Sequence, residues 1–339
     1  MFDPRRTETA HIATRYLAAR VGEDHAVLAF LVRELLRDGA DVDYVDRYVS
    51  DVGHLARAVE AFDLETVSHL SGLDANDLSA LLGAIRQHGR LAAFTGTGTS
   101  MSRSANVIEW LTWVLLIITG SLDRPGGMWF NPGFLKQLDR RALRLSSGVA
   151  GPGPRSRPEL PQRWGEYPCA ALSDEIEARN VRGLFVIGGN PLKALPDAGR
   201  LAAAMQTLDF LAVLDVVPTE ATTLATHVLP STGQLERSDL PLGLEQFLPS
   251  VATQYTHAVV PPGGERRPVW WTFAALAKEL GLDVLPPGLD LETCTDPDIL
   301  RFLARDARSS FDMLVEKATA IVAEDAVFGW VVDHLLPDG

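Results

Sequence analysis

The stretch that most constrains the fold of this chain lies at residues 183–237, where short apolar runs alternate with polar residues and one helical segment. The apolar runs cover residues 184–187, 210–214 and 226–229. Between the first two, residues 197–207 have apolar side chains at helical spacing, and Asp197 stands near the start, where a carboxylate suits the helix dipole. Nearly continuous apolar strands joined by a helix are typical of a parallel sheet. We therefore predict an α/β fold around this unit.

Polar residues follow two of these runs at the points where the predicted strands end. The sequence Gly-Gly-Asn at residues 188–190 follows the first strand, and Asp215 follows the second. Because ligands of parallel sheets bind beyond the carboxyl ends of the strands, we expect these residues to lie side by side. Turn geometry alone explains Asn190, but its amide can also bond a donor and an acceptor of a nucleotide, and Asp215 suits guanine or ribose. The sequence therefore predicts a nucleotide-sized site.

A second glycine-rich segment, FTGTGTSM at residues 94–101, connects a predicted strand at 91–95 to a predicted helix. Such loops direct backbone N–H groups at phosphates, although a tight turn accounts for the glycines equally well. Gly96 and Gly98 fit the dinucleotide fingerprint, but Met101 stands where its third glycine belongs, which disfavours an ordinary nicotinamide dehydrogenase. The neighbouring hydroxyls add donors without charge and suit a pocket for pyrophosphate or pterin.

Three charged residues near the N-terminus have structural interpretations, and two of them also allow a contact with a ligand. Asp3 is either an N-cap for the following turn or a carboxylate that binds guanine or ribose hydroxyls. Arg5 is either an ordinary surface side chain or a bidentate partner of a phosphate. Asp24 is a plausible N-cap of an amphipathic helix predicted at residues 24–37.

Helical and alternating patterns predict further elements along the chain. Helices are expected at residues 77–88, with Asp74 as the N-cap, and at 104–118, 269–280 and 296–323. A strand is expected at residues 251–260.

Three blocks of the chain, in a fixed order, resemble a known family. The first is DPRRTETA at residues 3–10 with VGED at 21–24, and the second is FTGTGTSMS at 94–102 with LIITGSLDRPGGMWFNPG at 116–133. The third comprises GGNPL, LDVVPTEAT, HVLPS and LER within residues 188–237. Through these blocks the chain resembles the molybdopterin oxidoreductase family, which includes formate dehydrogenases and periplasmic-type nitrate reductases. The resemblance covers residues 3–282 and implies two Rossmann-like domains that bind two molybdopterin guanine dinucleotides around one molybdenum.

The resemblance also implies a set of cofactor-binding residues. The family uses a Gly-x-Asp position for guanosine contact, which corresponds here to Gly22 and Asp24. Glu236 and Arg237 fall near the cofactor in the family, whereas the residues by themselves suggest a surface ion pair. The predicted cofactor-binding residues are Asp3, Arg5, Thr7, Gly22, Asp24, Gly96, Thr97, Gly98, Asn190, Asp215, Glu236 and Arg237. No catalytic residue is assigned, because in the family the molybdenum and the pterins perform the redox chemistry.

The expected fold is α/β, with two doubly wound Rossmann-like lobes, the first of them incomplete, and a helical C-terminal tail. The lobes are predicted at residues 1–90 and 91–285, with an exposed excursion at 136–170, and the tail at 286–339. Compared with the family, the molybdenum-ligating segment is expected upstream of residue 1 and a closing β-barrel-like domain after residue 339. The chain is therefore expected to correspond to the central portion of such an enzyme.

Two functions are compatible with this expectation. In the first, the chain is the molybdopterin guanine dinucleotide-binding portion of a molybdenum-dependent oxidoreductase, inactive alone unless the remaining parts are supplied in cis or by another chain. In the second, it is a cofactor-free remnant that acts as a structural or interaction subunit. An exposed apolar face is expected where the remaining parts would pack. The substrate is not indicated by the sequence.

Composition argues against several other classes of protein. The net charge of −13 over 339 residues disfavours nucleic acid, whose phosphates require clustered lysine and arginine. The longest apolar run, residues 110–118, is about half a membrane span, and no signal peptide is visible, so we expect a cytoplasmic protein, with an export signal on a longer N-terminus still compatible. Cys169 and Cys294 stand far apart, and the eight histidines form no HxxxH or HExxH pair. No iron–sulfur cluster and no other metal site is expected in this chain.

Overall fold

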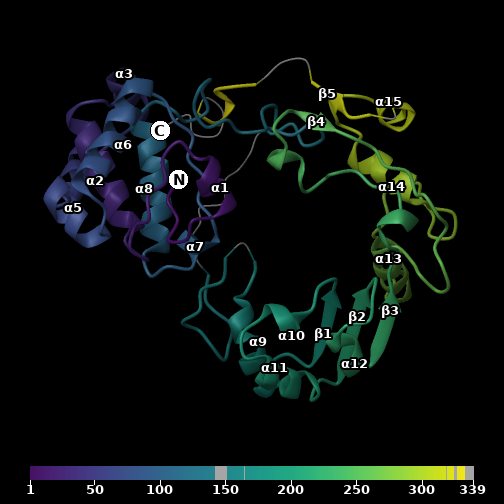
Figure 1. Cartoon of the computed structure of the whole chain (residues 1–339). Helices are drawn as coiled ribbons and strands as arrows, with labels where there is room; N and C mark the ends of the chain where they lie inside the picture. The colour runs from purple at the N-terminus through teal and green to yellow at the C-terminus, as the bar shows by residue number, and fades with distance from the viewer. Residues whose placement is uncertain (142–150, 164, 318, 324–326, 333–339) are drawn as a thin grey trace. The chain divides into compact units, whose positions relative to one another are not determined.

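The computed structural model describes residues 1–141, 151–163, 165–317, 319–323 and 327–332 (Figure 1). The chain forms two compact units, divided between Pro132 and Gly133. The first unit contains residues 1–132 together with the described residues 327–332, and the second contains the described residues from 133 to 323. The predicted α/β class is confirmed, because the chain combines a parallel sheet with many helices.

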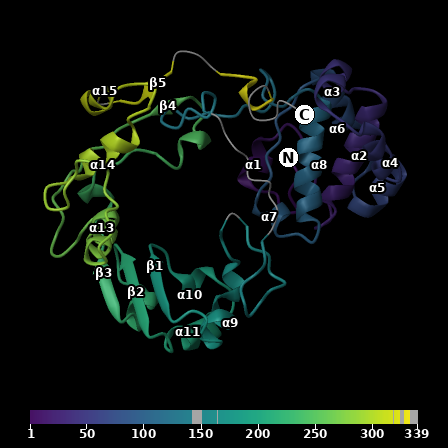
Figure 2. The ribbon, with the colours of Figure 1, turned by 180° about the vertical axis from the view of Figure 1, so that it is seen from behind.

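The first unit is built from helices. They are α1 (Glu8–Ile12), α2 (Asp24–Arg37), α3 (Val42–Tyr48), α4 (Val52–Val59), α5 (Leu64–Ser71), α6 (Ala75–His88), α7 (Thr97–Ser100) and α8 (Ala105–Ile118). Figures 1 and 2 show α2 and α8 side by side, and their apolar faces supply much of a buried core that includes Phe30, Leu35 and Leu115. The helices predicted at 24–37, 77–88 and 104–118 are confirmed, and Asp74 caps α6 by accepting from the backbone N–H of Asn76 at 2.7 Å.

The strand predicted at residues 91–95 is wrong. This segment has no regular secondary structure, and the backbone N–H of Leu91 donates instead to the Ser121 hydroxyl at 3.0 Å. A strand requires a paired neighbour, and among the described residues of the first unit the bridges, such as Phe2 with Leu17, are isolated. Because α8 packs against α2, residues 91–132 belong to the first unit. The two compact units are defined by their packing, whereas the boundaries predicted at residues 90 and 285 separate lobes that bind the cofactor. Those predicted boundaries therefore stay predictions.

Two distant segments of the chain meet in the first unit. The backbone N–H of Gly329 donates to the Asp123 carbonyl at 3.0 Å, and that of Val331 donates to the Asp123 carboxylate at 2.8 Å. The indole N–H of Trp330 donates to the Phe130 carbonyl at 2.9 Å. The described residues near the C-terminus are therefore part of this unit.

The second unit contains a parallel three-stranded sheet of order β1 (Gly183–Ile187), β2 (Phe210–Asp215) and β3 (His227–Pro230). Helix α9 (Leu172–Glu177) precedes the sheet, α10 (Pro191–Ala194) and α11 (Ala198–Met205) connect β1 to β2, and α12 (Glu220–Leu224) connects β2 to β3. Leu201 and Met205 of α11 pack with Leu211 and Val213 of β2 in a buried core. All three predicted strands and the helix between the first two are confirmed, and the Asp197 carboxylate accepts from the backbone N–H of Arg200 at 3.4 Å.

The remaining elements of the second unit follow the sheet. They are α13 (Val269–Glu279), α14 (Asp296–Leu303) and α15 (Phe311–Glu316), the short antiparallel pair β4 (Ala252–Thr253) and β5 (Ile321–Val322), and the 3-10 helices η1 (Cys169–Ala171), η2 (Gln234–Glu236) and η3 (Glu245–Phe247). The helix predicted at 269–280 is confirmed as α13. The strand predicted at 251–260 is limited to β4, and the helix predicted at 296–323 is divided into α14 and α15 and ends in β5.

Side-chain anchors hold the long segment that precedes β1. The Glu245 carboxylate is fully buried and accepts from the backbone N–H groups of Leu135 and Lys136 at 2.7 and 2.8 Å. The Glu175 carboxylate accepts from the backbone N–H of Ser156 at 2.7 Å. Within the excursion predicted at residues 136–170, residues 142–150 and 164 lie outside the described residues. The described parts of this segment are thus tied to the second unit at several points.

Candidate functional site

The carboxyl ends of β1 and β2 lie at the same edge of the sheet. Ile187 pairs with Leu214 in the parallel register, and the backbone N–H of Gly188 donates to the Leu214 carbonyl at 2.8 Å. Gly188 and Gly189 have φ values of +60° and +79°, which L-residues with a side chain rarely adopt. No atom lies within 4 Å of the position that a Cβ would take at either glycine, so the backbone here faces open space. We call this edge, residues 188–190 together with Asp215, the nucleotide rim.

Asn190 is the N-cap of α10, and both ends of its amide are engaged. The Asn190 Oδ1 accepts from the backbone N–H of Leu192 at 3.2 Å, and its Nδ2 donates to Glu220 Oε2. Pro191 occupies the first helical position, where its missing N–H has no cost. Asn190 therefore has a structural role, but as a helix N-cap with ordinary extended dihedrals (φ −122°, ψ 99°) and not as a residue of an unusual turn. Its role in binding a nucleotide stays a prediction.

Glu220 contacts Asn190 of the nucleotide rim, and the sequence analysis did not single it out. It is the first residue of α12, and its Oε1 lies 2.8 Å from Lys193 Nζ. Hydrogen bonds from Lys193, then from the backbone N–H of Glu220 itself and from Asn190, lower the pKa of the Glu220 carboxyl from its ordinary value. The signal in the sequence was Thr219-Glu220 after the second strand, a pattern that starts a helix beside the edge of a sheet.

Asp215 ends β2 at the same edge as Asn190. Its Oδ1 accepts from the backbone N–H of Val216 at 2.7 Å, and its carbonyl accepts from the backbone N–H of Ser231 at 3.0 Å. Val216 and Val217, which follow it, are exposed. The structure therefore brings Asp215 and residues 188–190 to one edge, as the parallel arrangement of the strands required.

Glu236 and Arg237 do not pair with each other. The Glu236 side chain is 9% exposed and accepts from the backbone N–H of Gly233 at 2.9 Å, from that of Gly263 at 3.1 Å and from Arg266 at 2.6 Å. Arg237 instead pairs with Asp239 at 3.0 Å. The interpretation of these two residues as one surface ion pair is therefore wrong, and Glu236 serves to hold a loop. Their contact with a cofactor stays a prediction.

The segment before α1 contains three of the predicted cofactor-binding residues, Asp3, Arg5 and Thr7. The Asp3 Oδ1 accepts from the backbone N–H of Arg5 at 2.8 Å, which is a local turn and not a helix cap. Thr7 is the N-cap of α1 and accepts from the backbone N–H of Ala10 at 3.3 Å. Asp3 therefore caps the turn that follows it, in line with its structural interpretation, and Thr7 caps the helix α1.

Gly22 and Asp24 lie at the start of α2. Gly22 has a φ of +92°, and Asp24 is the first residue of the helix. The N-cap is Glu23, whose side chain makes no capping hydrogen bond, so the cap predicted at Asp24 is displaced by one position. Asp24 still stabilises the helix from its first turn, where a negative charge complements the dipole.

The glycine-rich segment forms the start of α7. Gly96 is its N-cap, Thr97 is its first residue, and no atom lies within 4 Å of a Cβ position at Gly96 or Gly98. The hydroxyls of Thr99 and Ser100 donate back to carbonyls of the same turn, at 2.7 Å to Gly96 and 3.1 Å to Thr97. The Thr99 and Ser100 hydroxyls are therefore used within the turn, and the predicted role of the hydroxyls of this loop as donors to a pocket stays a prediction. Because this segment belongs to the first unit, its convergence with the nucleotide rim stays a prediction.

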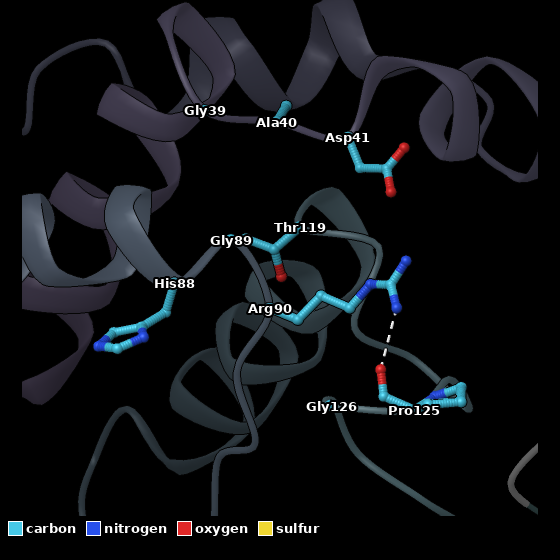
Figure 3. Close-up of a pocket in the computed structure, with 9 residues that line it drawn as sticks. All are labelled: Gly39, Ala40, Asp41, His88, Gly89, Arg90, Thr119, Pro125 and Gly126. Atoms are coloured by element: carbon cyan, nitrogen blue, oxygen red, sulfur yellow. Dashed lines mark hydrogen bonds between the residues drawn. The ribbon is translucent and has the colours of Figure 1, made fainter.

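A hollow of about 760 Å³ lies elsewhere in the first unit (Figure 3). Its lining residues are Gly39, Ala40, Asp41, His88, Gly89, Arg90, Thr119, Pro125 and Gly126. The Arg90 guanidinium lies in the middle of it and donates to the Pro125 carbonyl at 2.9 Å. The predicted cofactor-binding residues do not line this hollow.

In the part of the chain that the structure describes, no group of three or more histidine, cysteine, aspartate or glutamate side chains is placed to hold a metal ion. Among the same residues, every helix is too short or too polar to cross a membrane.

A family model and curated proteins that resemble this chain are all molybdopterin oxidoreductases or enzymes of the nitrate reductase and formate dehydrogenase types. Residues 1–279 match the family model described as molybdopterin oxidoreductase. The chain is 26% identical over 311 residues to a nitrate reductase of Symbiobacterium thermophilum, covering 82% of this chain and 40% of that protein. It is 25% identical over 310 residues to the F420-dependent formate dehydrogenase 2 subunit alpha of Methanococcus maripaludis, covering 82% of this chain and 42% of that protein.

The fold has a counterpart among solved structures. Acetylene hydratase from Pelobacter acetylenicus superimposes with a TM-score of 0.76 at 17% identity, covering 95% of this chain and 48% of that chain. The chain spans about two fifths of the length of the nitrate reductase and formate dehydrogenase relatives. Because the family model matches most of its residues, the chain belongs to the molybdopterin oxidoreductase family.

Proposed function

We propose that this chain binds molybdopterin guanine dinucleotide and is the cofactor-binding portion of a molybdenum-dependent oxidoreductase of the formate dehydrogenase and nitrate reductase type. Membership of the family supports this proposal. When bound, the molybdenum and the pterins supply the redox chemistry, and the protein positions them. The substrate and the electron-transfer partner are not specified by this proposal.

The nucleotide rim is the observation that carries the proposal. Its two glycines leave the backbone open to a ligand, because both have positive φ and neither has an atom near a Cβ position. Asp215 follows at the neighbouring strand end and has one carboxylate oxygen engaged by the backbone of Val216. A carboxylate with a second oxygen available suits the N–H groups of guanine or the hydroxyls of ribose. The residues present therefore fit the nucleotide end of the cofactor.

Further residues are proposed to contact the cofactor from the first unit. They are Asp3, Arg5, Thr7, Gly22, Asp24, Gly96, Thr97 and Gly98. The open space at Gly96 and Gly98 suits close approach of a pyrophosphate or a pterin to the backbone. The matched relatives are more than twice as long as this chain, so turnover is proposed to require their remaining parts, in the same polypeptide or in a second chain.

Binding of GDP to the full chain, measured by isothermal titration calorimetry, tests the proposal. Asp215→Asn is expected to weaken binding about tenfold, because it removes a charged acceptor from the rim. Asp209→Asn is the matched control, since Asp209 precedes β2 and pairs with Arg179 and Arg182 at the opposite end of the same strand. Failure of the chain to bind GDP, or equal loss in both variants, would contradict the proposal.

A structural or interaction subunit is the second candidate, and one observation favours it. Val107, Trp110 and Trp113 of α8 are all exposed, with 52% of Trp110 accessible to solvent. Apolar side chains gathered on one helix are typical of surfaces that another protein covers. A chain that binds no GDP but self-associates in analytical ultracentrifugation, and becomes monomeric on Trp110→Glu, would favour this candidate.

A further inference from the structure

Residues 327–332, which we call the strap, are bonded to the first unit through their backbone. The N–H groups of Gly329 and Val331 both donate to Asp123, at 3.0 Å to its carbonyl and at 2.8 Å to its carboxylate. Asp123 is fully buried, so water does not compete with the strap for these acceptors. These contacts attach the strap, which is far along the chain, to a loop that follows α8.

Two indoles complete the attachment of the strap. The Trp330 indole N–H donates to the Phe130 carbonyl at 2.9 Å, and the Trp129 indole N–H donates to the Val327 carbonyl at 2.9 Å. Trp330 is buried, and a buried tryptophan removes a large apolar surface from water. Trp330 therefore contributes most of the apolar part of this attachment.

The strap contacts a loop, residues 121–128, that also forms part of the wall of the hollow. Pro125 and Gly126 of this loop line the hollow (Figure 3). The backbone N–H of Asp123 donates to the Met128 carbonyl at 2.8 Å, which closes the loop. Asp123 has a φ of +50°, which residues other than glycine adopt uncommonly and which surrounding contacts must maintain. The strap supplies such contacts at Asp123 itself.

The residues of the hollow hold the same loop more weakly. Arg90 donates to the Pro125 carbonyl at 2.9 Å, as Figure 3 shows, but its side chain is only half-buried. Asp41 pairs with Arg124 at 3.0 Å, and both of these side chains are partly exposed. Partly exposed ion pairs contribute little to stability, because water competes for both charges. The buried contacts of the strap are therefore the stronger hold on the loop.

We propose that the strap is a conformational device that keeps the hollow in its present form. While it is docked it fixes residues 121–128, and when it detaches the loop opens and Arg90 loses its acceptor at Pro125. Detachment is local, because Val332 of the strap packs in a small cluster separate from the core around α2. The inference does not depend on the proposed function, since the strap and the hollow belong to the first unit and the nucleotide rim to the second.

Hydrogen exchange of the full chain, followed by mass spectrometry, tests this inference with Trp330→Ala. This variant changes the strap and leaves the sequence of the loop intact. Residues 327–332 are expected to exchange about tenfold faster than in the wild type or more, because the indole hydrogen bond and the buried ring are lost. Residues 121–128 are expected to accelerate by a similar factor, whereas the amides of α2 are expected to keep the wild-type rate.

A chemical probe reports on the hollow directly. Phenylglyoxal modifies arginine side chains, and peptide mapping identifies the fraction modified at Arg90. The rate at Arg90 is expected to rise about threefold in Trp330→Ala, because the guanidinium is released from the Pro125 carbonyl.

Two further variants separate release of the strap from general destabilisation. Trp110→Ala is the matched control, because Trp110 is a half-exposed tryptophan of α8 in the same unit, and it is expected to keep wild-type exchange in both segments. Trp330→Phe keeps a ring and loses only the N–H that donates to Phe130, so a smaller acceleration of about threefold is expected in both segments. This variant also decides the question if Trp330→Ala does not fold.

The inference is supported if exchange accelerates in the strap and in residues 121–128 together, with faster modification of Arg90. A strap that exchanges faster while the loop keeps its wild-type rate, or an unchanged rate at Arg90, would overturn it. Wild-type exchange of the strap in both Trp330 variants would also overturn it. Equal acceleration in α2, or the same acceleration in Trp110→Ala, would show a loss of stability of the whole unit and would count against a local device.

Discussion

Asp215 and Glu236 lie in the same unit, the first at the end of β2 and the second shortly after β3, yet their carboxylates are used in different ways. Glu236 is nearly buried and accepts from two backbone N–H groups and from Arg266. Asp215 has one oxygen on the backbone of Val216, and exposed residues follow it. A carboxylate whose acceptors are satisfied by the protein holds a loop, whereas one with a free oxygen can meet a ligand. Glu245, fully buried on two backbone N–H groups, is the extreme case of the first kind.

The largest effect on stability is expected from Glu245→Ala. It leaves the buried N–H groups of Leu135 and Lys136 without their acceptor, which is expected to lower the free energy of unfolding by about 3 kcal/mol. Urea unfolding followed by circular dichroism measures this change. Glu265→Ala, at an exposed position, is the control and is expected to have no measurable effect. Equal unfolding midpoints for Glu245→Ala and Glu265→Ala would show that the buried carboxylate contributes no more to stability than the exposed one.

A smaller loss is expected from Glu236→Ala. The loop amides of Gly233 and Gly263 lose their acceptor but can turn to water, so the thermal midpoint is expected to fall by about 4 °C. Differential scanning calorimetry measures this shift. A variant that keeps its midpoint but loses affinity for GDP would place Glu236 with Asp215 among the ligand-facing carboxylates.

The pH dependence of stability tests the loop-holding role of Glu236. The backbone N–H of Gly233, and then Gly263 and Arg266, hold the pKa of Glu236 below its ordinary value of 4.5. Because the folded pKa is depressed, the stabilisation is present above pH 4.5 and is lost as the pH falls through the lower, folded pKa. Unfolding midpoints measured from pH 6 to pH 3 are expected to decline less steeply in Glu236→Gln than in the wild type. Parallel profiles would contradict this account.

The smallest effect on stability is expected from Asp215→Asn. The asparagine side-chain oxygen can still accept the hydrogen bond from the backbone N–H of Val216. The free energy of unfolding is therefore expected to stay within about 0.5 kcal/mol of the wild type. Urea unfolding in the absence of nucleotide is the measurement. Destabilisation as large as that of Glu236→Ala would remove the distinction between the two carboxylates.

The sequence predicted the parallel unit correctly because each of its signals is local. The apolar runs that became β1, β2 and β3 are short and bounded by glycine, aspartate or proline, and Asp197 caps the helix between them. The adjacency of Asn190 and Asp215 followed from the strand ends. The family was likewise predicted from the order of its motifs, and the family model confirms it.

Predictions that depended on distant partners were less successful. Residues 91–95 have the composition of a strand, but they find no strand to pair with among the described residues. Glu220 was missed because its importance arises from contacts with Asn190 and Lys193, which lie about 30 residues earlier in the chain. The pairing of Glu236 with Arg266 was missed for the same reason, since its neighbour Arg237 was the obvious partner by sequence alone. Side-chain partners across loops are set by tertiary packing, which single-sequence patterns do not encode.

The two rim glycines with positive φ, Gly188 and Gly189, would be preserved in a related chain even if that chain no longer bound a nucleotide. Gly188 and Gly189 are required by the backbone conformation of the turn, whether or not a ligand is present, because any other L-residue would be strained there. Selection for folding alone is therefore enough to preserve them. The Asp215 side chain has no comparable structural duty, so it is free to drift once binding is no longer selected. If Asp215 binds the nucleotide as we propose, we expect the aspartate, and not the glycine pair, to distinguish a working site from a relic among related chains.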